Sequence, residues 1–184
     1  MPRVFLAFVL AILFAAGAVA QEKAEHLTFT DHKGRTVSER DYLGSYQLIF
    51  FGYTHCPDVC PMDLQILSQT MAALGPQGKR VRPIFITFDP ERDTAPVMTS
   101  YVSNFHPRLI GLTGTKAQIS AAARAYEVVA EKSSESDDAK EYLINHTALT
   151  YLIGPKGEGL EIFDHGTGPE AMVARIRAHL DKDK

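Results

Sequence analysis

The stretch Leu48-Ile-Phe-Phe-Gly-Tyr-Thr-His-Cys-Pro-Asp-Val-Cys-Pro61 decides how this chain folds. Its first half belongs to an apolar run of strand type, Tyr46 to Tyr53, and its second half contains both cysteines of the chain, Cys56 and Cys60. Proline is tolerated at the first position of a helix, because the N–H that it lacks would have no partner there. The stretch therefore predicts a strand followed at once by a helix that begins at Pro57 and carries Cys60 on its first turn.

The position of the cysteines at the start of a helix has a chemical consequence. The partial positive charge at a helix N-terminus stabilises a thiolate relative to a thiol, and the thiolate is the form that attacks disulfides and binds soft metals. A four-residue step along a helix separates β-carbons by roughly 5–6 Å, which suits a metal ion between Cys56 and Cys60. A disulfide requires β-carbons about 3.5–4.5 Å apart, and a small backbone adjustment would bring them to that distance. A disulfide between Cys56 and Cys60 is therefore an alternative to a bound metal ion. Such a bridge would stabilise the fold little, because it closes a very short loop.

The first twenty residues have the features of a secretory signal peptide. Arg3 precedes an apolar run from Val4 to Ala16, and Ala18-Val19-Ala20 forms a small-residue cleavage site before Gln21. An uncleaved N-terminal anchor is the alternative, because the apolar segment reaches the lower limit of roughly 17–25 residues for a spanning helix.

Residues 21–184 are expected to form one domain, since their length suffices for one sizeable core. The formal net charge of the chain is −3, and the sequence lacks the basic stripe that nucleic-acid binding requires. The export signal predicts the periplasm or another exported compartment, with the domain either free or tethered by its N-terminus. Contact with a membrane is expected only through a partner or an uncleaved N-terminus.

Strand and helix patterns alternate along the rest of the chain. Before the cysteines we expect a hairpin over Leu27–Thr30 and Arg35–Val37 and a helical turn over Ser38–Leu43. After them we expect the helix to run through Leu74, followed by a strand over Val81–Phe88, a helix over Ala95–Asn104, a strand over Leu109–Leu112, a helix over Lys116–Tyr126, a short strand over Glu127–Ala130, an acidic surface loop over Lys132–Lys140, a hairpin over Ala148–Ile153 and Gly159–Phe163, and a closing helix over Pro169–Asp181.

A parallel βαβ unit followed by a β-hairpin and a final helix is the plan of a thioredoxin-like fold. The predicted fold class is therefore α/β, with a central mixed sheet flanked by helices and an added N-terminal β-hairpin. The strand Tyr46–Tyr53 is apolar on both faces, as expected of a strand that helices cover on both sides. Ligands of such open sheets bind beyond the carboxyl ends of the strands, and Cys56 and Cys60 follow the carboxyl end of this central strand.

Four segments together resemble the Sco/SenC family of copper-binding, thioredoxin-like proteins. They are the cysteine stretch, Ile86-Thr-Phe-Asp-Pro-Glu-Arg-Asp-Thr94, Gly111-Leu-Thr-Gly-Thr115 and Asn145-His-Thr-Ala-Leu-Thr-Tyr-Leu-Ile-Gly-Pro-Lys-Gly157. The resemblance extends over Leu27–Leu180. It implies a metallochaperone for cytochrome c oxidase, which delivers copper to the dinuclear copper centre of subunit II or reduces the cysteines of that centre.

The resemblance also implies which residues bind the metal. The family's ligands correspond to Cys56, Cys60 and His146, whereas Asp89 lies near the metal in the family and is not predicted as a ligand. The implied cargo is Cu(I) or Cu(II), and the implied partners are subunit II and possible suppliers such as a periplasmic copper chaperone or a thioredoxin-like reductant. We expect the loop Lys132–Lys140 and the residues leading to His146 to move when metal binds.

The residues by themselves leave other functions open. Two thiolates and an imidazole suit copper, but the same set also occurs in catalytic zinc sites. A thiol–disulfide oxidoreductase in which Cys56 and Cys60 are redox-active catalytic thiols is the main alternative to a non-enzymatic metallochaperone. A peroxiredoxin-type peroxidase is disfavoured, because Tyr53 stands where that family's pattern has threonine and Ile49 where it has proline.

Other side chains near these motifs are assigned structural roles. His55 adjoins Cys56, but a side chain next in line on a turn usually points elsewhere, so we do not assign it to the metal. Met62 and Met71 are expected to fill gaps in the core. Asp93 is expected on a solvated acidic face.

Overall fold

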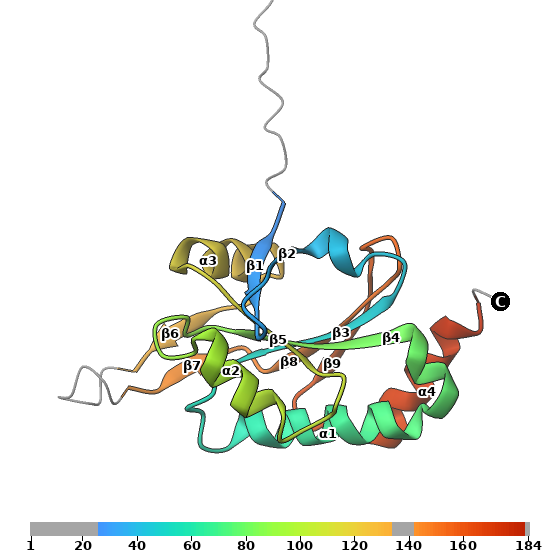
Figure 1. Cartoon of the computed structure of the whole chain (residues 1–184). Coiled ribbons are helices and arrows are strands. Elements are labelled where there is room, and N and C mark those ends of the chain that lie inside the picture. The colour runs from blue at the N-terminus through green and yellow to red at the C-terminus, as the bar shows by residue number, and fades with distance from the viewer. Residues whose placement is uncertain (1–25, 134–141, 183–184) are drawn as a thin grey trace, which may run out of the picture.

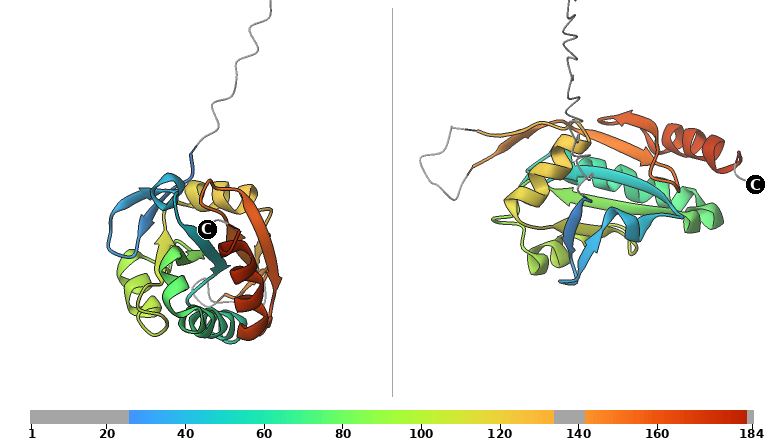
Figure 2. Two further views of the ribbon diagram at one scale, coloured as in Figure 1. Left: turned by 90° about the vertical axis from the view of Figure 1, so that its right-hand side faces the viewer. Right: turned by 90° about the horizontal axis from the view of Figure 1, so that it is seen from above.

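The protein is described by a computed structural model that covers residues 26–133 and 142–182. A seven-stranded mixed sheet in the order β2-β1-β5-β4-β3-β8-β9 forms its middle layer. Helices α1, α2 and α4 pack on one face of this sheet and α3 on the other (Figures 1 and 2). None of the helices in the described ranges combines the length and apolar character needed to cross a membrane.

The elements have the following bounds. The strands are β1 (Thr28–Asp31), β2 (Thr36–Ser38), β3 (Tyr46–Gly52), β4 (Val81–Thr87), β5 (Ile110–Thr113), β6 (Ala130–Lys132), β7 (Ile144–His146), β8 (Leu149–Ile153) and β9 (Gly159–Asp164). The helices are α1 (Val59–Ala73), α2 (Ala95–Val102), α3 (Lys116–Ala125) and α4 (Pro169–Leu180), with short 3-10 helices η1 (Glu39–Tyr42) and η2 (Gly75–Arg80).

Strand β3 occupies the middle of the sheet and is buried along its whole length. It pairs in parallel with β4 and antiparallel with β8. Because side chains alternate across a strand, Leu48 and Phe50 enter the core under α1, whereas Ile49 and Phe51 enter the core under α3. The prediction of a central strand covered on both faces is confirmed.

The remaining strands confirm the predicted α/β class and mixed sheet. Strands β3, β4 and β5 are parallel, whereas β1, β8 and β9 run antiparallel to their neighbours. The predicted N-terminal hairpin, β1 and β2, joins the sheet beside β5, with Thr30 opposite Thr113. It therefore extends the main sheet. The predicted C-terminal hairpin and closing helix form as β8, β9 and α4.

Helix α1 begins at Val59 rather than at the predicted Pro57. The chain first makes a tight turn, in which the N–H of Cys56 donates to the carbonyl of Tyr53 over 3.3 Å. The N–H of Cys60 then donates to Sγ of Cys56, also over 3.3 Å, so a sulfur takes the place of a capping oxygen. Cys60 lies in the first helical turn as predicted, whereas Cys56 precedes the helix.

A second, two-stranded sheet is formed by β6 and β7. The sequence predicts a strand over Glu127–Ala130, but Glu127 has a left-handed backbone with φ of 54°, which delays the strand to β6. No strand is predicted between the loop Lys132–Lys140 and the hairpin that starts at Ala148, but the structure has β7 there. Residues 134–140 of the predicted loop Lys132–Lys140 lie outside the described residues. The movement expected of this loop when metal binds therefore stays a prediction.

A buried carboxylate holds the loop after β4. Asp93 has no exposed surface, so the prediction of a solvated position is wrong. It accepts hydrogen bonds from the backbone N–H of Thr54 over 2.9 Å, from the Thr54 hydroxyl and from the Thr87 hydroxyl. A buried carboxylate needs such donors, because its desolvation is otherwise unfavourable. Asp93 thereby ties the cysteine loop after β3 to the end of β4.

Removal of this carboxylate should destabilise the fold. We expect Asp93→Ala to lower the free energy of unfolding by about 2–4 kcal/mol, because buried donors lose their acceptor. Glu91→Ala in the same loop is the control, since Glu91 makes exposed ion pairs with Lys116 and Lys132, and surface pairs contribute about 0–1 kcal/mol. Denaturant unfolding measures both variants, and equal effects would contradict the structural role of Asp93.

Candidate metal centre

Two thiols and an imidazole meet beyond the carboxyl end of β3. Cys56 lies in the loop after β3, Cys60 in the first turn of α1, and His146 is the last residue of β7. Their ligand atoms all lie within 4.8 Å of one another, and Sγ of Cys60 is 3.4 Å from Nε2 of His146. Both cysteines are free thiols. The fold thus brings together the three side chains predicted as ligands, although 86 residues separate Cys60 from His146.

The ring of His146 is oriented by aromatic and backbone contacts. It lies edge-on to the ring of Tyr53, with 5.9 Å between centroids, and tilted against Phe88 at 5.2 Å. Its Nδ1 is 3.1 Å from the carbonyl oxygen of Thr147. A proton on Nδ1 that donates to this carbonyl leaves the lone pair of Nε2 on the side of Cys60. The imidazole is thereby preset to act as a ligand through Nε2.

Glycine at position 52 makes room for the sulfur of Cys60. A β-carbon there would lie 2.8 Å from Sγ of Cys60 and 2.9 Å from Cε2 of Phe85. Because Cys60 has no exposed surface, a side chain at position 52 would displace the sulfur or the ring. Sequence reasoning missed this role of Gly52, and the signal for it was a glycine inside a buried strand, which often marks a close approach.

Comparison with known proteins assigns the family of this chain. The profile of the family described as SCO1/SenC matches residues 16–181. The chain belongs to the SCO1/SenC family.

Relatives of this SCO1/SenC protein occur in eukaryotes and bacteria. The mitochondrial protein SCO1 homolog of Mus musculus is 41% identical over 155 residues, which cover 83% of this chain and 54% of the relative. Protein SenC of Rhodobacter capsulatus is 36% identical over 165 residues, which cover 90% of this chain and 74% of the relative. The chain spans 54% and 65% of the length of the Mus musculus and Homo sapiens SCO1 homologs.

Solved structures of the family share the fold. Arabidopsis thaliana ScoI with copper bound has a TM-score of 0.80 and 32% identity, covering 86% of this chain and 98% of that structure. Bradyrhizobium japonicum ScoI with copper bound has a TM-score of 0.77 and 40% identity, covering 84% and 97%. The thioredoxin-like fold predicted for this SCO1/SenC protein is thereby confirmed.

The two thiols of this SCO1/SenC protein differ in acidity. The pKa of Cys56 is lowered to about 3, first because the thiol of Cys60 donates a hydrogen bond to its sulfur. Burial opposes this shift, while hydrogen bonds from the backbone N–H groups of Cys60 and Asp58 add to it. The pKa of Cys60 is raised, first by the same hydrogen bond and then by burial. Cys56 is therefore the thiolate of the pair at neutral pH, and Cys60 is its proton donor.

Two other candidates lie outside the three-residue metal group. Asp89 is buried and accepts hydrogen bonds from the Tyr142 hydroxyl over 2.6 Å and from Nε of Arg92. Its carboxylate is thus engaged by two donors of the protein. The side chain of His55 is 51% exposed, and its Nδ1 is 3.1 Å from the hydroxyl of Thr54, so it turns to its neighbour rather than to the metal group.

The two methionines of α1 have different surroundings. Met71 is buried in the core under α1, as predicted. Met62 is 42% exposed, so its prediction as a core residue is wrong. Helical spacing could have separated the two, because nine residues are two and a half turns and place them on opposite faces of α1. Met71 lies on the buried face with Leu64 and Leu67, and Met62 does not.

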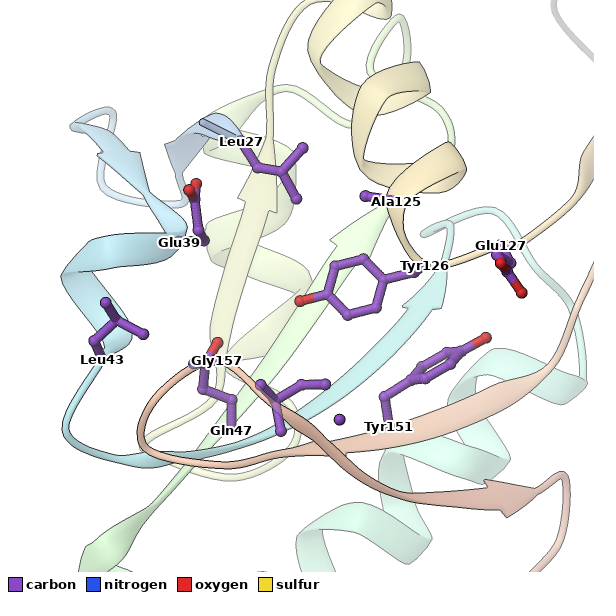
Figure 3. Close-up of a pocket in the computed structure, with 11 residues that line it drawn as sticks. Leu27, Glu39, Leu43, Gln47, Ala125, Tyr126, Glu127, Tyr151 and Gly157 are labelled. Carbon is purple, nitrogen blue, oxygen red and sulfur yellow. The ribbon is translucent and has the colours of Figure 1, made fainter. Parts of the chain in front are cut away.

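A separate cavity of about 440 Å³ lies on the face of the sheet that α3 covers, away from the face that α1 covers. Figure 3 shows the hydroxyl of Tyr126 pointing into it, with Leu27, Leu43 and Tyr151 around it. No cysteine or histidine is found among the described residues that line it. The cavity is therefore not part of the metal centre, which is a cluster at the end of β3.

Substitution of Gly52 should disturb both the packing and the sulfur. We expect Gly52→Ala to lower the free energy of unfolding by about 1–3 kcal/mol, because the new methyl group overlaps Cys60 Sγ and Phe85. Gly159→Ala is the control, since a β-carbon at that position meets no atom within 4 Å. If denaturant unfolding shows the same stability for both variants, the close approach of Cys60 to β3 is not a constraint.

The acidity of Cys56 predicts an unusual pH profile of alkylation. Its rate with iodoacetamide should stay nearly constant from about pH 8 to about pH 5, because the thiolate persists until the pH falls through its pKa of about 3. An ordinary thiol with a pKa of about 8.5 loses roughly three orders of magnitude of thiolate over that range. Cys60→Ala should restore this steep fall, since it removes the main hydrogen-bond donor. Mass spectrometry measures the rates, and a steep profile in the unmodified protein would contradict the assignment.

Proposed function

We propose that this protein is a non-enzymatic copper metallochaperone that assists assembly of the dinuclear copper centre of cytochrome c oxidase subunit II. Copper is its cargo, held as Cu(I) or Cu(II) by Cys56, Cys60 and His146. The observation that carries the proposal is the convergence of two Sγ atoms and one imidazole nitrogen within 4.8 Å. The copper-bound structures of the Arabidopsis thaliana and Bradyrhizobium japonicum relatives support it. The choice of partner rests on family resemblance.

The donor set fits copper by its chemistry. Two thiolates form a soft set suited to Cu(I), and a borderline imidazole nitrogen lets the same site hold Cu(II). Structural zinc sites almost always have four protein ligands, whereas the group formed by the described residues has three. A catalytic zinc site also has three, so membership in the SCO1/SenC family decides for copper.

The exposure of the ligands suits transfer of the ion to another protein. Cys60 is buried, whereas Cys56 and His146 are partly exposed. An incoming thiolate of the recipient can replace the exposed ligands one at a time, so the ion keeps a protein ligand throughout. A buried four-ligand cage would oppose such exchange.

The proposed setting is an exported compartment such as the periplasm. The signal-like residues 1–20 support export, and they leave open a free or N-terminally tethered domain. A periplasmic copper chaperone or a thioredoxin-like reductant would supply copper or reduced cysteines.

A thiol–disulfide oxidoreductase is the competing function for the same two sulfurs. Disulfide exchange needs Cys56 and Cys60, but it does not need an imidazole nitrogen 3.4 Å from Cys60. The placement of His146 therefore favours copper handling over redox exchange. A variant of His146 separates the two functions.

Copper titration of the reduced protein, followed by visible absorption and electron paramagnetic resonance, tests the proposal. The unmodified protein should bind one equivalent of Cu(II) with thiolate-to-copper charge-transfer bands. His146→Ala should weaken Cu(II) binding by about tenfold or more, because the nitrogen ligand is lost. His55→Ala is the matched control, since this histidine adjoins Cys56 but lies outside the metal group, and its bands should be unchanged.

The same variants decide between the competing functions. His146→Ala should keep disulfide exchange between Cys56 and Cys60 and fail to support oxidase assembly. If it supports assembly fully, the copper proposal is wrong. Unmodified protein that retains no copper but cycles between dithiol and disulfide would make it an oxidoreductase.

A further inference from the structure

Strand β7, which carries His146, lies outside the seven-stranded sheet and pairs with β6 alone among the described strands. Ile144 is buried, and its N–H donates to the hydroxyl of Tyr53 over 3.1 Å. The N–H of Thr147 donates to the carbonyl of Val129 over 3.0 Å. Besides its pairing with β6, the strand that carries the imidazole is therefore held by contacts at its two ends.

Tyr142, just before β7, makes an unusual set of contacts for a partly exposed side chain. The guanidinium carbon of Arg92 lies 3.6 Å from its ring centroid, and Nζ of Lys132 lies 3.9 Å from it. Its hydroxyl donates to Oδ1 of Asp89 over 2.6 Å, and Asp89 is itself 2% exposed. A cation over an aromatic face is attracted by the ring quadrupole. Tyr142 thus joins the loop after β4, the end of β6 and the approach to β7.

These contacts continue to the metal ligand. The guanidinium of Arg92 also lies over the ring of Tyr53, 5.9 Å from its centroid. The ring of Tyr53 in turn meets the ring of His146 edge-on. Successive cation–ring and ring–ring contacts therefore connect Lys132, Tyr142, Arg92, Tyr53 and His146.

We propose that Tyr142 is a positioning residue that sets how strongly the metal centre favours Cu(II) relative to Cu(I), an inference that rests on the proposed copper function. By holding the start of β7 against Asp89 and Arg92, Tyr142 keeps Nε2 of His146 beside Cys60. Cu(I) is satisfied by two thiolates, whereas Cu(II) gains more from the nitrogen ligand. Loss of Tyr142 therefore weakens Cu(II) binding and leaves Cu(I) binding unchanged.

Chelator competition with Cu(II) and with Cu(I), on the full chain, measures this preference. Tyr142→Ala is expected to lose about tenfold in Cu(II) affinity, the lower end of the range for groups that orient a metal ligand, with no change for Cu(I). The nitrogen hyperfine coupling in electron paramagnetic resonance should weaken with it. Tyr142→Phe keeps the stacked ring and loses the bond to Asp89, so its effect should be smaller.

Two lysines provide a second test variant, at Lys132, and a matched control, at Lys116. Lys132 and Lys116 both form ion pairs with Glu91, and of the two Lys132 lies over the ring of Tyr142. Lys132→Ala should lower Cu(II) affinity in the same direction as Tyr142→Ala. Lys116→Ala should leave it unchanged.

The outcomes separate this inference from the proposed function. Equal losses of Cu(I) and Cu(II) affinity, or an unchanged nitrogen coupling in Tyr142→Ala, would overturn the role of Tyr142. Thermal unfolding of the metal-free variants checks their folding, and if Tyr142→Ala does not fold, Tyr142→Phe and Lys132→Ala decide the question. Unmodified protein that binds no copper would instead overturn the proposed function.

Discussion

The close approach of the sulfur of Cys60 to Gly52, where a β-carbon would not fit, is the constraint on which the metal centre depends. It lets the first turn of α1 pack directly on the end of β3, so that Cys60 belongs to the core under that helix. The chain between strand and helix makes a tight turn at Tyr53–Cys56, and the N–H of Cys60 donates to the sulfur of Cys56. Asp93 secures this turn from the neighbouring loop through Thr54. One ligand is thus built into the hydrophobic core, and the second follows from it.

The hydrogen bond between the two sulfurs also shifts their pKa values in opposite directions. Since one thiol donates to the other, Cys56 is a thiolate and Cys60 retains its proton. A soft metal ion therefore meets an ionised ligand on the partly exposed sulfur. Binding to Cys60 must release a proton, because thiolate is the ligating form. The pair thus offers a cation one sulfur ligand that is already ionised.

The third ligand is held by a different kind of force. His146 stands on a two-stranded sheet whose position is set by hydrogen bonds and by charges stacked on rings around Tyr142. Such contacts are directional and weaker than close packing, so they allow small adjustments that a core does not. One sulfur in the core, one sulfur in the adjoining turn and a nitrogen on a separate small sheet suit an ion whose two oxidation states favour different ligands.

What the sequence by itself determined is local: a central strand over Tyr46–Tyr53, which the structure ends at Gly52, both terminal hairpins, and the placement of Cys56 and Cys60 near a helix start. A continuous apolar run and a four-residue spacing are properties of neighbours along the chain, so they can be seen without the fold. The resemblance to a family, and not the residues around it, pointed to His146. The burial of Asp93, the sulfur cap that delays α1 and the strand β7 could not be predicted, because each depends on contacts between distant segments. Only the tertiary structure decided them, since it alone brings Cys60 and His146, 86 residues apart, to within 3.4 Å.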